Sequence, residues 1–110
     1  TTITNVAHLR IKESDRLRAP ARALARIGVS VDEHDDGLTI HGLGSQARIQ
    51  IGDTVFEGCN DHRMVMSEAL FSLRSDDVRP DGIRAHIDTP DAVNKSFPEF
   101  WHTWESCFED

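Results

Sequence analysis

This chain of 110 residues has no long apolar run, no closely spaced cysteine pair and few lysines. Each absence excludes a class of protein or a kind of binding site. No apolar stretch approaches the roughly 20 residues of a membrane-spanning helix, and no signal peptide is visible. Cys59 and Cys107 lie far apart without a CxxC spacing, which argues against a zinc knuckle and favours free thiols in a reducing compartment. We therefore expect a cytoplasmic protein that does not associate with membranes and binds no metal.

Positive charge is also in short supply. The chain has 12 basic and 19 acidic residues, a net charge of −7, which argues against a general nucleic-acid binder. Only two of the basic residues are lysines, Lys12 and Lys95, and both fall in the motifs described below. The length fits a single domain over residues 1–110, and the first residue is Thr1 rather than methionine, so we expect a piece of a longer protein.

Opposite charges are clustered in the run Lys12-Glu13-Ser14-Asp15-Arg16, directly after an alternating apolar stretch at 6–11 that is typical of a strand. Ser14 or Asp15 is a suitable N-cap for the next helix, because its side-chain oxygen accepts from free backbone N–H groups. A helix N-terminus carries partial positive charge, so cations there are unfavourable unless an anion joins them. Lys12 and Arg16 therefore indicate a ligand with phosphate or carboxylate groups. The alternative is a solvated turn between strand and helix.

A helix is predicted from Ser14 to Ile27 by the spacing of its apolar residues, and Gly28 marks its end. Pro20 lacks the N–H that a regular first turn would use, so the regular helix is expected from about Arg18.

Strands are predicted after this helix. Alternating residues around the acidic turn Asp35-Asp36-Gly37 predict a β-hairpin. Arg48–Gly52 and Ile83–Ile87 are predicted as further strands.

Two more helix starts carry cations. Asn60 or Asp61 is the predicted cap of a helix whose first turn contains His62 and Arg63. Its predicted apolar stripe is formed by Val65 or Met66, Ala69, Leu70 and Leu73.

The third predicted cap is Ser96, with Lys95 just before it, and an aromatic face from Phe97 to Phe108 is expected to pack in the core. The fold class is therefore α/β, an α+β-like mixed sheet with three helices. Three helix N-termini that each carry a cation are easily satisfied together if they converge on one polyanionic ligand.

Three runs are ordered and spaced in a recognisable way: Leu9-Arg10-Ile11-Lys12-Glu13-Ser14-Asp15-Arg16, Asn60-Asp61-His62-Arg63-Met64 and Lys95-Ser96-Phe97-Pro98. Together they resemble the C-terminal part of the 5-enolpyruvylshikimate-3-phosphate (EPSP) synthase family, the 3-phosphoshikimate 1-carboxyvinyltransferases. The resemblance covers nearly the whole chain and implies part of one lobe of a two-lobed enolpyruvyl transferase fold. It implies an enzyme of the shikimate pathway, which leads to chorismate and the aromatic amino acids.

Enzymes of this family transfer the enolpyruvyl group of phosphoenolpyruvate (PEP) to the 5-hydroxyl of shikimate 3-phosphate, with release of phosphate and without a metal or organic cofactor. By resemblance, Glu13 is the acid/base candidate for the PEP methylene, and Lys12 beside it binds substrate and assists proton transfer. Which of the two moves which proton stays open. The resemblance assigns PEP binding to residues with a positive charge or a ring nitrogen: Arg16, His62, Arg63 and Lys95.

For shikimate 3-phosphate, the resemblance implies contacts from Lys12 and from the position of His8, where the family often has Asn. The remaining shikimate 3-phosphate motifs and an essential aspartate belong to the N-terminal part of such enzymes. The expected partners are thus the two substrates and that missing part, for a monomeric enzyme that binds neither nucleic acid nor membranes. We expect the isolated chain to be inactive. The competing hypothesis is a stand-alone, non-catalytic anion-binding or interaction module with the same fold.

Overall fold

The computed structural model describes residues 1–109, which form two compact units, one at 1–47 and the other beginning at Arg48. The architecture is mixed α/β, with an antiparallel sheet in the first unit and helices in both. The expectation of a single domain stays a prediction. Within residues 1–109, no helix combines the length and the apolar character needed to cross a membrane.

The first unit is built on a three-stranded antiparallel sheet in the order β1-β3-β2, comprising β1 (Thr2–Ile3), β2 (Ser30–His34) and β3 (Gly37–His41). The predicted hairpin is confirmed, because β2 and β3 pair with Val31 opposite Ile40 across the turn at 35–36. Gly37 begins β3 where a Cβ atom would lie 1.8 Å from the backbone oxygen of Ile3. This close approach to β1 requires glycine.

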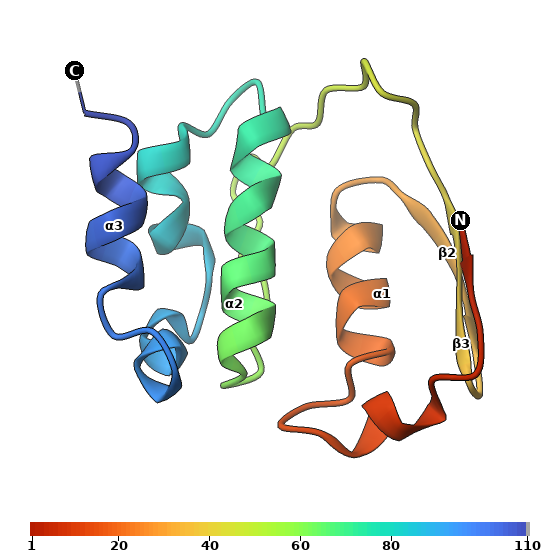
Figure 1. Ribbon diagram of the computed structural model, residues 1–110. Coiled ribbons are helices and arrows are strands. Elements are labelled where there is room, and N and C mark those ends of the chain that lie inside the picture. The colour runs from red at the N-terminus through yellow and green to blue at the C-terminus, as the bar shows by residue number, and fades with distance from the viewer. Residues whose placement is uncertain (110) are drawn as a thin grey trace. The chain divides into compact units, whose positions relative to one another are not determined.

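Helix α1 (Arg18–Arg26) lies over one face of this sheet (Figure 1). The prediction that regular helix begins at Arg18 is confirmed. Pro20 falls in the first turn, where its missing N–H removes no helical hydrogen bond. Gly28, with φ of 89°, ends the helix as predicted. The buried apolar side chains of this unit come from the helix, its flanks and β3: Leu17, Ala19, Ala23, Val29 and Leu38.

The segment before α1 differs from the sequence prediction. The alternating stretch at 6–11 is not a strand but a 3-10 helix, η1 (Ala7–Ile11). None of its residues is buried, and Ile11 is 84% exposed. Alternation of apolar residues alone does not distinguish a short strand from a single tight helical turn.

The second unit is mostly helical, with α2 (His62–Ala69), η2 (Leu70–Arg74), η3 (Pro80–His86), η4 (Pro90–Lys95) and α3 (Phe100–Ser106). Its buried apolar side chains include Phe56, Val65, Ile83, Val93 and Trp101. The expected aromatic packing is confirmed at Trp101, which is 4% exposed and donates its indole N–H to the Pro90 oxygen at 2.8 Å, but it is wrong at Phe97, which is 39% exposed.

Both strand predictions in the second unit are wrong. Residues 48–52 contain only one isolated bridge, from Ile49 to Ser75, because the N–H groups of Ile51 and Gly52 donate to the carboxylate of Asp77. Residues 83–87 lie mainly in η3, and only Ile87 forms a bridge, to Phe56. In the first segment, the carboxylate of Asp77 accepts the hydrogen bonds that a neighbouring strand would accept. In the second, Pro80 begins a 3-10 helix that includes most of the predicted strand.

Two helix details also differ from the prediction. Ser96 does not cap the last helix, because it follows η4 and α3 begins only at Phe100. In the second helix, Leu70 and Leu73 are 53% and 46% exposed, whereas Met64 and Glu68 are buried. The chain tightens into η2 after α2, and the change to three residues per turn rotates the apolar stripe away from the core.

Candidate functional site

The predicted site residues form two groups, one in each unit. His8, Lys12, Glu13 and Arg16 belong to η1 and the loop that leads into α1, whereas His62, Arg63 and Lys95 belong to α2 and the end of η4. That the two groups act on one ligand stays a prediction.

The loop at 12–16 projects between η1 and α1 and is closed by a backbone hydrogen bond from Arg16 N–H to the Leu9 oxygen, 2.9 Å long. At its tip, Glu13 Oε2 lies 2.6 Å from a guanidinium nitrogen of Arg16. The Glu13 side chain is 47% exposed, whereas that of Arg16 is only 14% exposed. The loop therefore presents Lys12 and Glu13 to solvent above a largely covered guanidinium.

The Asp15 side chain bonds to the start of the helix that follows this loop. Its Oδ1 accepts from the backbone N–H groups of Leu17 and Arg18, both at 3.0 Å, and its Oδ2 accepts from Arg10. Burial alone would raise the pKa of Asp15, but these hydrogen bonds outweigh it and hold the pKa below its ordinary value. The N-cap position of α1 is Leu17, which has no side-chain cap, and not Ser14 or Asp15 as predicted, but the Asp15 side chain does accept from the first backbone N–H groups of the helix.

In the second unit, the turn before α2 adopts an unusual backbone conformation. Cys59 and Asn60 have φ values of 57° and 50°, in the left-handed region. Preceding them, Gly58 packs so closely that a Cβ atom would lie 2.3 Å from Thr89 Oγ1. The turn is fastened to the segment around η4 by hydrogen bonds from Gly58 N–H to Asp88 and from Asn60 N–H to Thr89, at 2.8 and 3.1 Å.

Lys95 also connects the segment around η4 to the turn before α2. Its Nζ donates to the backbone oxygen of Asn60, so the ammonium lies against the turn that precedes α2. Lys95 and the Asn60–Arg63 segment, far apart in the sequence, are therefore brought together by the fold.

Asp61 is the confirmed N-cap of α2, where its fully buried carboxylate accepts from Arg63 N–H at 3.0 Å. The Nδ1 atom of His62 is buried without a hydrogen-bond partner among residues 1–109. The Arg63 side chain, by contrast, is exposed. The cap thus orients a ring nitrogen and a guanidinium in the same helical turn.

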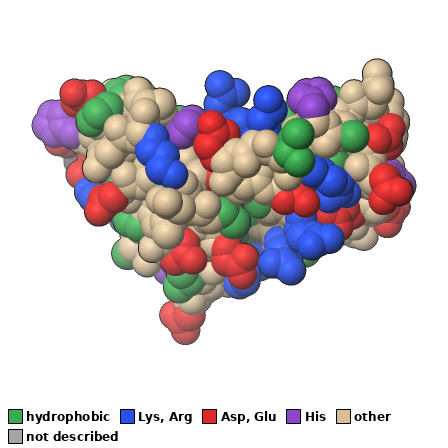
Figure 2. All heavy atoms as spheres, turned by 90° about the horizontal axis from the view of Figure 1, so that it is seen from below, with side chains coloured by type: hydrophobic (Ala, Val, Ile, Leu, Met, Phe, Trp, Pro, Cys, Tyr) green, Lys and Arg blue, Asp and Glu red, His purple; other side chains and the backbone are tan. Residues whose placement is uncertain are grey.

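The basic side chains differ in whether the protein already neutralises them. In the part of the chain that the structure describes, Lys12 and Arg63 form no side-chain hydrogen bond or ion pair, whereas Arg48, Arg79 and Arg84 each contact a carboxylate within 3.2 Å. On the face drawn in Figure 2, basic side chains are interspersed with acidic ones. Lys12 and Arg63 are therefore available to an anionic ligand, since no internal carboxylate competes for them.

Other expectations about single residues can also be checked. Cys59 and Cys107 are free and exposed, as predicted. Burial, with the nearby carboxylates of Glu57 and Glu68, raises the pKa of the Cys59 thiol, so it stays protonated and is a poor nucleophile. His41 Nε2 lies 2.8 Å from a carboxylate oxygen of Asp32 at the surface.

Sequence analysis missed the residues that support the two groups. The loop at 12–16 is held by Arg10, and the turn before α2 is held by Asp88 and Thr89. Of these three residues, only Arg10 lies within one of the three motifs, and the sequence predicted no function for it. The closeness of Arg10 to Asp15 in the sequence was the one available signal.

Comparisons with known proteins agree on one family. Residues 1–104 match the model described as EPSP synthase (3-phosphoshikimate 1-carboxyvinyltransferase). The 3-phosphoshikimate 1-carboxyvinyltransferase of Syntrophobacter fumaroxidans is 42% identical over 103 residues, which are 94% of this chain and 22% of that protein. The enzyme of the same name from Xanthomonas oryzae pv. oryzae is 46% identical over 101 residues, or 91% of this chain and 20% of the relative.

A solved structure of EPSP synthase from Acinetobacter baumannii matches with a TM-score of 0.74 and 28% identity, covering 94% of this chain and 22% of that one. The fold described above is thus similar to part of a larger structure. The chain spans about a fifth of the length of the curated relatives it matches.

Proposed function

This chain belongs to the EPSP synthase family, and from that premise we propose that it contributes part of the active site of a 3-phosphoshikimate 1-carboxyvinyltransferase. In the proposed reaction, the methylene carbon of PEP gains a proton and becomes a methyl group, while the 5-hydroxyl of shikimate 3-phosphate gives up its own proton and its oxygen bonds to C2. Loss of a methylene-derived proton and of phosphate then restores the enol double bond. The proposed contribution of this chain is to bind the anionic groups of PEP and to move that proton.

The observation that carries this proposal is the state of the basic side chains. The side chains of Lys12 and Arg63, both within the family's motifs, form no hydrogen bond or ion pair among residues 1–109. A cation that is left without a carboxylate partner in a chain of net charge −7 is well suited to an anionic substrate. Arg16, which is mostly covered, is proposed to join them in PEP binding through its planar guanidinium.

Glu13 is proposed as the acid/base group. Its carboxylate is held 2.6 Å from Arg16 at the tip of an exposed loop. A cation that binds both Glu13 and PEP would bring the carboxylate next to the methylene carbon, and Lys12, the adjacent residue, would assist the transfer. The ammonium of Lys95, which donates to the Asn60 backbone oxygen, is proposed to bind the departing phosphate together with His62.

The remaining substrate contacts are proposed to come from polypeptide outside these 110 residues, because the chain spans about 22% of its relatives. The shikimate 3-phosphate motifs and an aspartate would be supplied there. On this proposal the chain alone binds PEP weakly and does not turn over.

The test measures phosphate release from PEP plus shikimate 3-phosphate with two proteins. One is the 110-residue chain, and the other is a chimera in which residues 1–104 replace the matching segment of the Acinetobacter baumannii enzyme. We expect no release from the chain and measurable release from the chimera.

Cooperative thermal unfolding establishes that each protein is folded. Turnover by the chain alone would contradict the need for further polypeptide. A folded chimera without turnover, together with PEP binding by the chain, would favour the stand-alone anion-binding module instead.

A further inference from the structure

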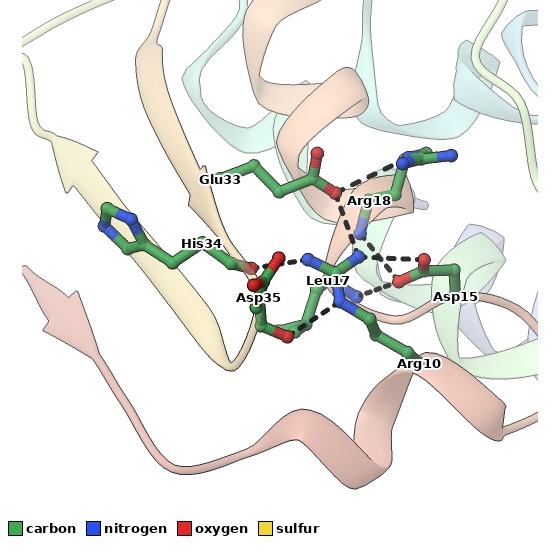
Figure 3. Close-up of polar contacts among 7 residues, drawn as sticks. All are labelled: Arg10, Asp15, Leu17, Arg18, Glu33, His34 and Asp35. Carbon is green, nitrogen blue, oxygen red and sulfur yellow. Dashed lines mark hydrogen bonds and ion pairs between the residues drawn. The ribbon is translucent and has the colours of Figure 1, made fainter.

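The Arg10 guanidinium forms four hydrogen bonds within the first unit. Its Nε donates to the Asp35 oxygen at 2.9 Å, and a terminal nitrogen donates to Asp15 Oδ2 at 3.0 Å and to Glu33 Oε1 at 3.2 Å. The other terminal nitrogen donates to the His34 oxygen. Figure 3 shows Arg10 reaching from η1 into a space bordered by the hairpin and the start of α1. One side chain therefore joins three elements.

The bonds of Arg10 lie at the base of the loop at 12–16, where its two ends meet. Arg10 lies just before the loop and Asp15 lies near its end, so their ion pair spans the residues that carry Lys12 and Glu13. The backbone bond from Arg16 to Leu9 closes the loop one position farther out on each side. The loop is thus held at its base by two nested contacts, and Arg10 also fastens this base to the hairpin.

Only arginine suits this position. Two backbone oxygens and two carboxylates approach one planar group, which matches the several N–H donors of a guanidinium fork and not the compact ammonium of lysine. Burial would lower the pKa of Arg10, but the hydrogen bonds to Glu33 and Asp15 outweigh it, and the pKa is raised. The guanidinium thus remains charged and bonded throughout the ordinary pH range.

We propose that Arg10 is a positioning residue, which fastens the loop at 12–16 to the hairpin so that Lys12, Glu13 and Arg16 are ordered before PEP binds. This inference rests on the proposed function. Arg10 itself would not touch PEP, because four of its five N–H donors already bond to protein oxygens. Without Arg10, binding would have to order the loop, and ordering of side chains at binding weakens affinity.

The test uses the 15N-labelled 110-residue chain with PEP as the probe, followed by NMR. Three variants are compared: Arg10→Lys, Arg10→Ala and the matched control Arg18→Ala. The control also removes a guanidinium that lies 3.5 Å from Glu33, but the Arg18 side chain is 57% exposed and, unlike that of Arg10, does not bond to the backbone oxygens of His34 and Asp35. The amide signals of Val31 and Ile40 report whether the hairpin stays folded.

With the hairpin intact, we expect both Arg10 variants to bind PEP about tenfold more weakly than the wild-type chain, while Arg18→Ala binds as the wild type does. We also expect faster hydrogen exchange of the Arg16 amide in both Arg10 variants without PEP, since that amide closes the loop. If Arg10→Ala loses the hairpin signals, Arg10→Lys carries the test. A merely structural function would lower stability and leave the affinity of the folded molecules unchanged.

An Arg10→Lys chain with a folded hairpin, wild-type PEP affinity and wild-type exchange at Arg16 would overturn the inference. The proposed function fails separately, if the wild-type chain shows no PEP-dependent shift at Lys12 or Arg16. In that case the exchange measurement still decides: faster exchange at Arg16 in the Arg10 variants supports a positioning function for the loop, and unchanged exchange overturns it.

Discussion

Replacement of Arg63 by alanine should separate ligand binding from stability. The Arg63 side chain is exposed and forms no hydrogen bond or ion pair among residues 1–109, so its removal breaks no internal contact. The backbone N–H that Asp61 accepts from is retained in alanine, so the cap of α2 also survives. The free energy of unfolding should therefore change by no more than about 0.5 kcal/mol.

PEP binding should respond very differently. A hydrogen bond between charged groups contributes about 1.5–3 kcal/mol, and the exposure of Arg63 places its contribution near the middle of that range. Loss of about 2 kcal/mol corresponds to a dissociation constant, or a KM for PEP, that rises about 30-fold. Because PEP would keep its other cations, binding should weaken rather than disappear.

Arg84→Ala is the matched control in the same unit. Arg84 contacts Asp91 at 2.9 Å and lies over the Trp101 ring, 5.7 Å from its centroid. Its loss should cost about 0.5–1.5 kcal/mol of stability and leave PEP affinity unchanged, since this guanidinium is already committed to protein groups.

The assay combines isothermal titration of PEP into the chimera, steady-state kinetics and thermal unfolding of both variants. We expect Arg63→Ala to lose PEP affinity and keep its stability, and Arg84→Ala to lose stability and keep its PEP affinity. The proposal that unpaired cations mark the PEP site is refuted if Arg63→Ala keeps its PEP affinity within twofold of the parent.

Two further predictions concern carboxylates. Glu13→Gln in the chimera should lower kcat by about 10²–10⁴-fold with little change in the KM for PEP, and a kcat within a few-fold of the parent would exclude proton transfer by Glu13. For Asp77, hydrogen bonds from Ile51 N–H, the Ser75 hydroxyl and Gly52 N–H hold the pKa below the ordinary 3.8. A lowered folded-state pKa means that this stabilisation is complete above about pH 4 and is lost as the pH falls through the folded value. Asp77→Asn should therefore flatten the acid limb of the stability curve in urea unfolding between pH 5 and 2, and an unchanged acid limb would contradict this linkage.

Sequence alone was sufficient where the deciding contacts are local. The hairpin was predicted because alternation and an acidic turn belong to neighbouring residues, and β2 and β3 pair as expected. The start of α1 followed from Asp15 and Pro20, whose effects on the helix act within one turn. The three motifs likewise identified the family from side chains in order along the chain, which the comparisons confirm over residues 1–104.

Tertiary structure decided what depends on distant partners. Ile51 donates to Asp77 instead of a strand neighbour, and the phase of the α2 stripe changes where the helix tightens, and neither effect is encoded in local periodicity. In the candidate site, sequence named Lys12 and Arg63 but could not show that they lack internal partners, since this depends on where every carboxylate lies. The four bonds of Arg10 join residues up to 25 positions apart, and only folding brings these acceptors around one guanidinium.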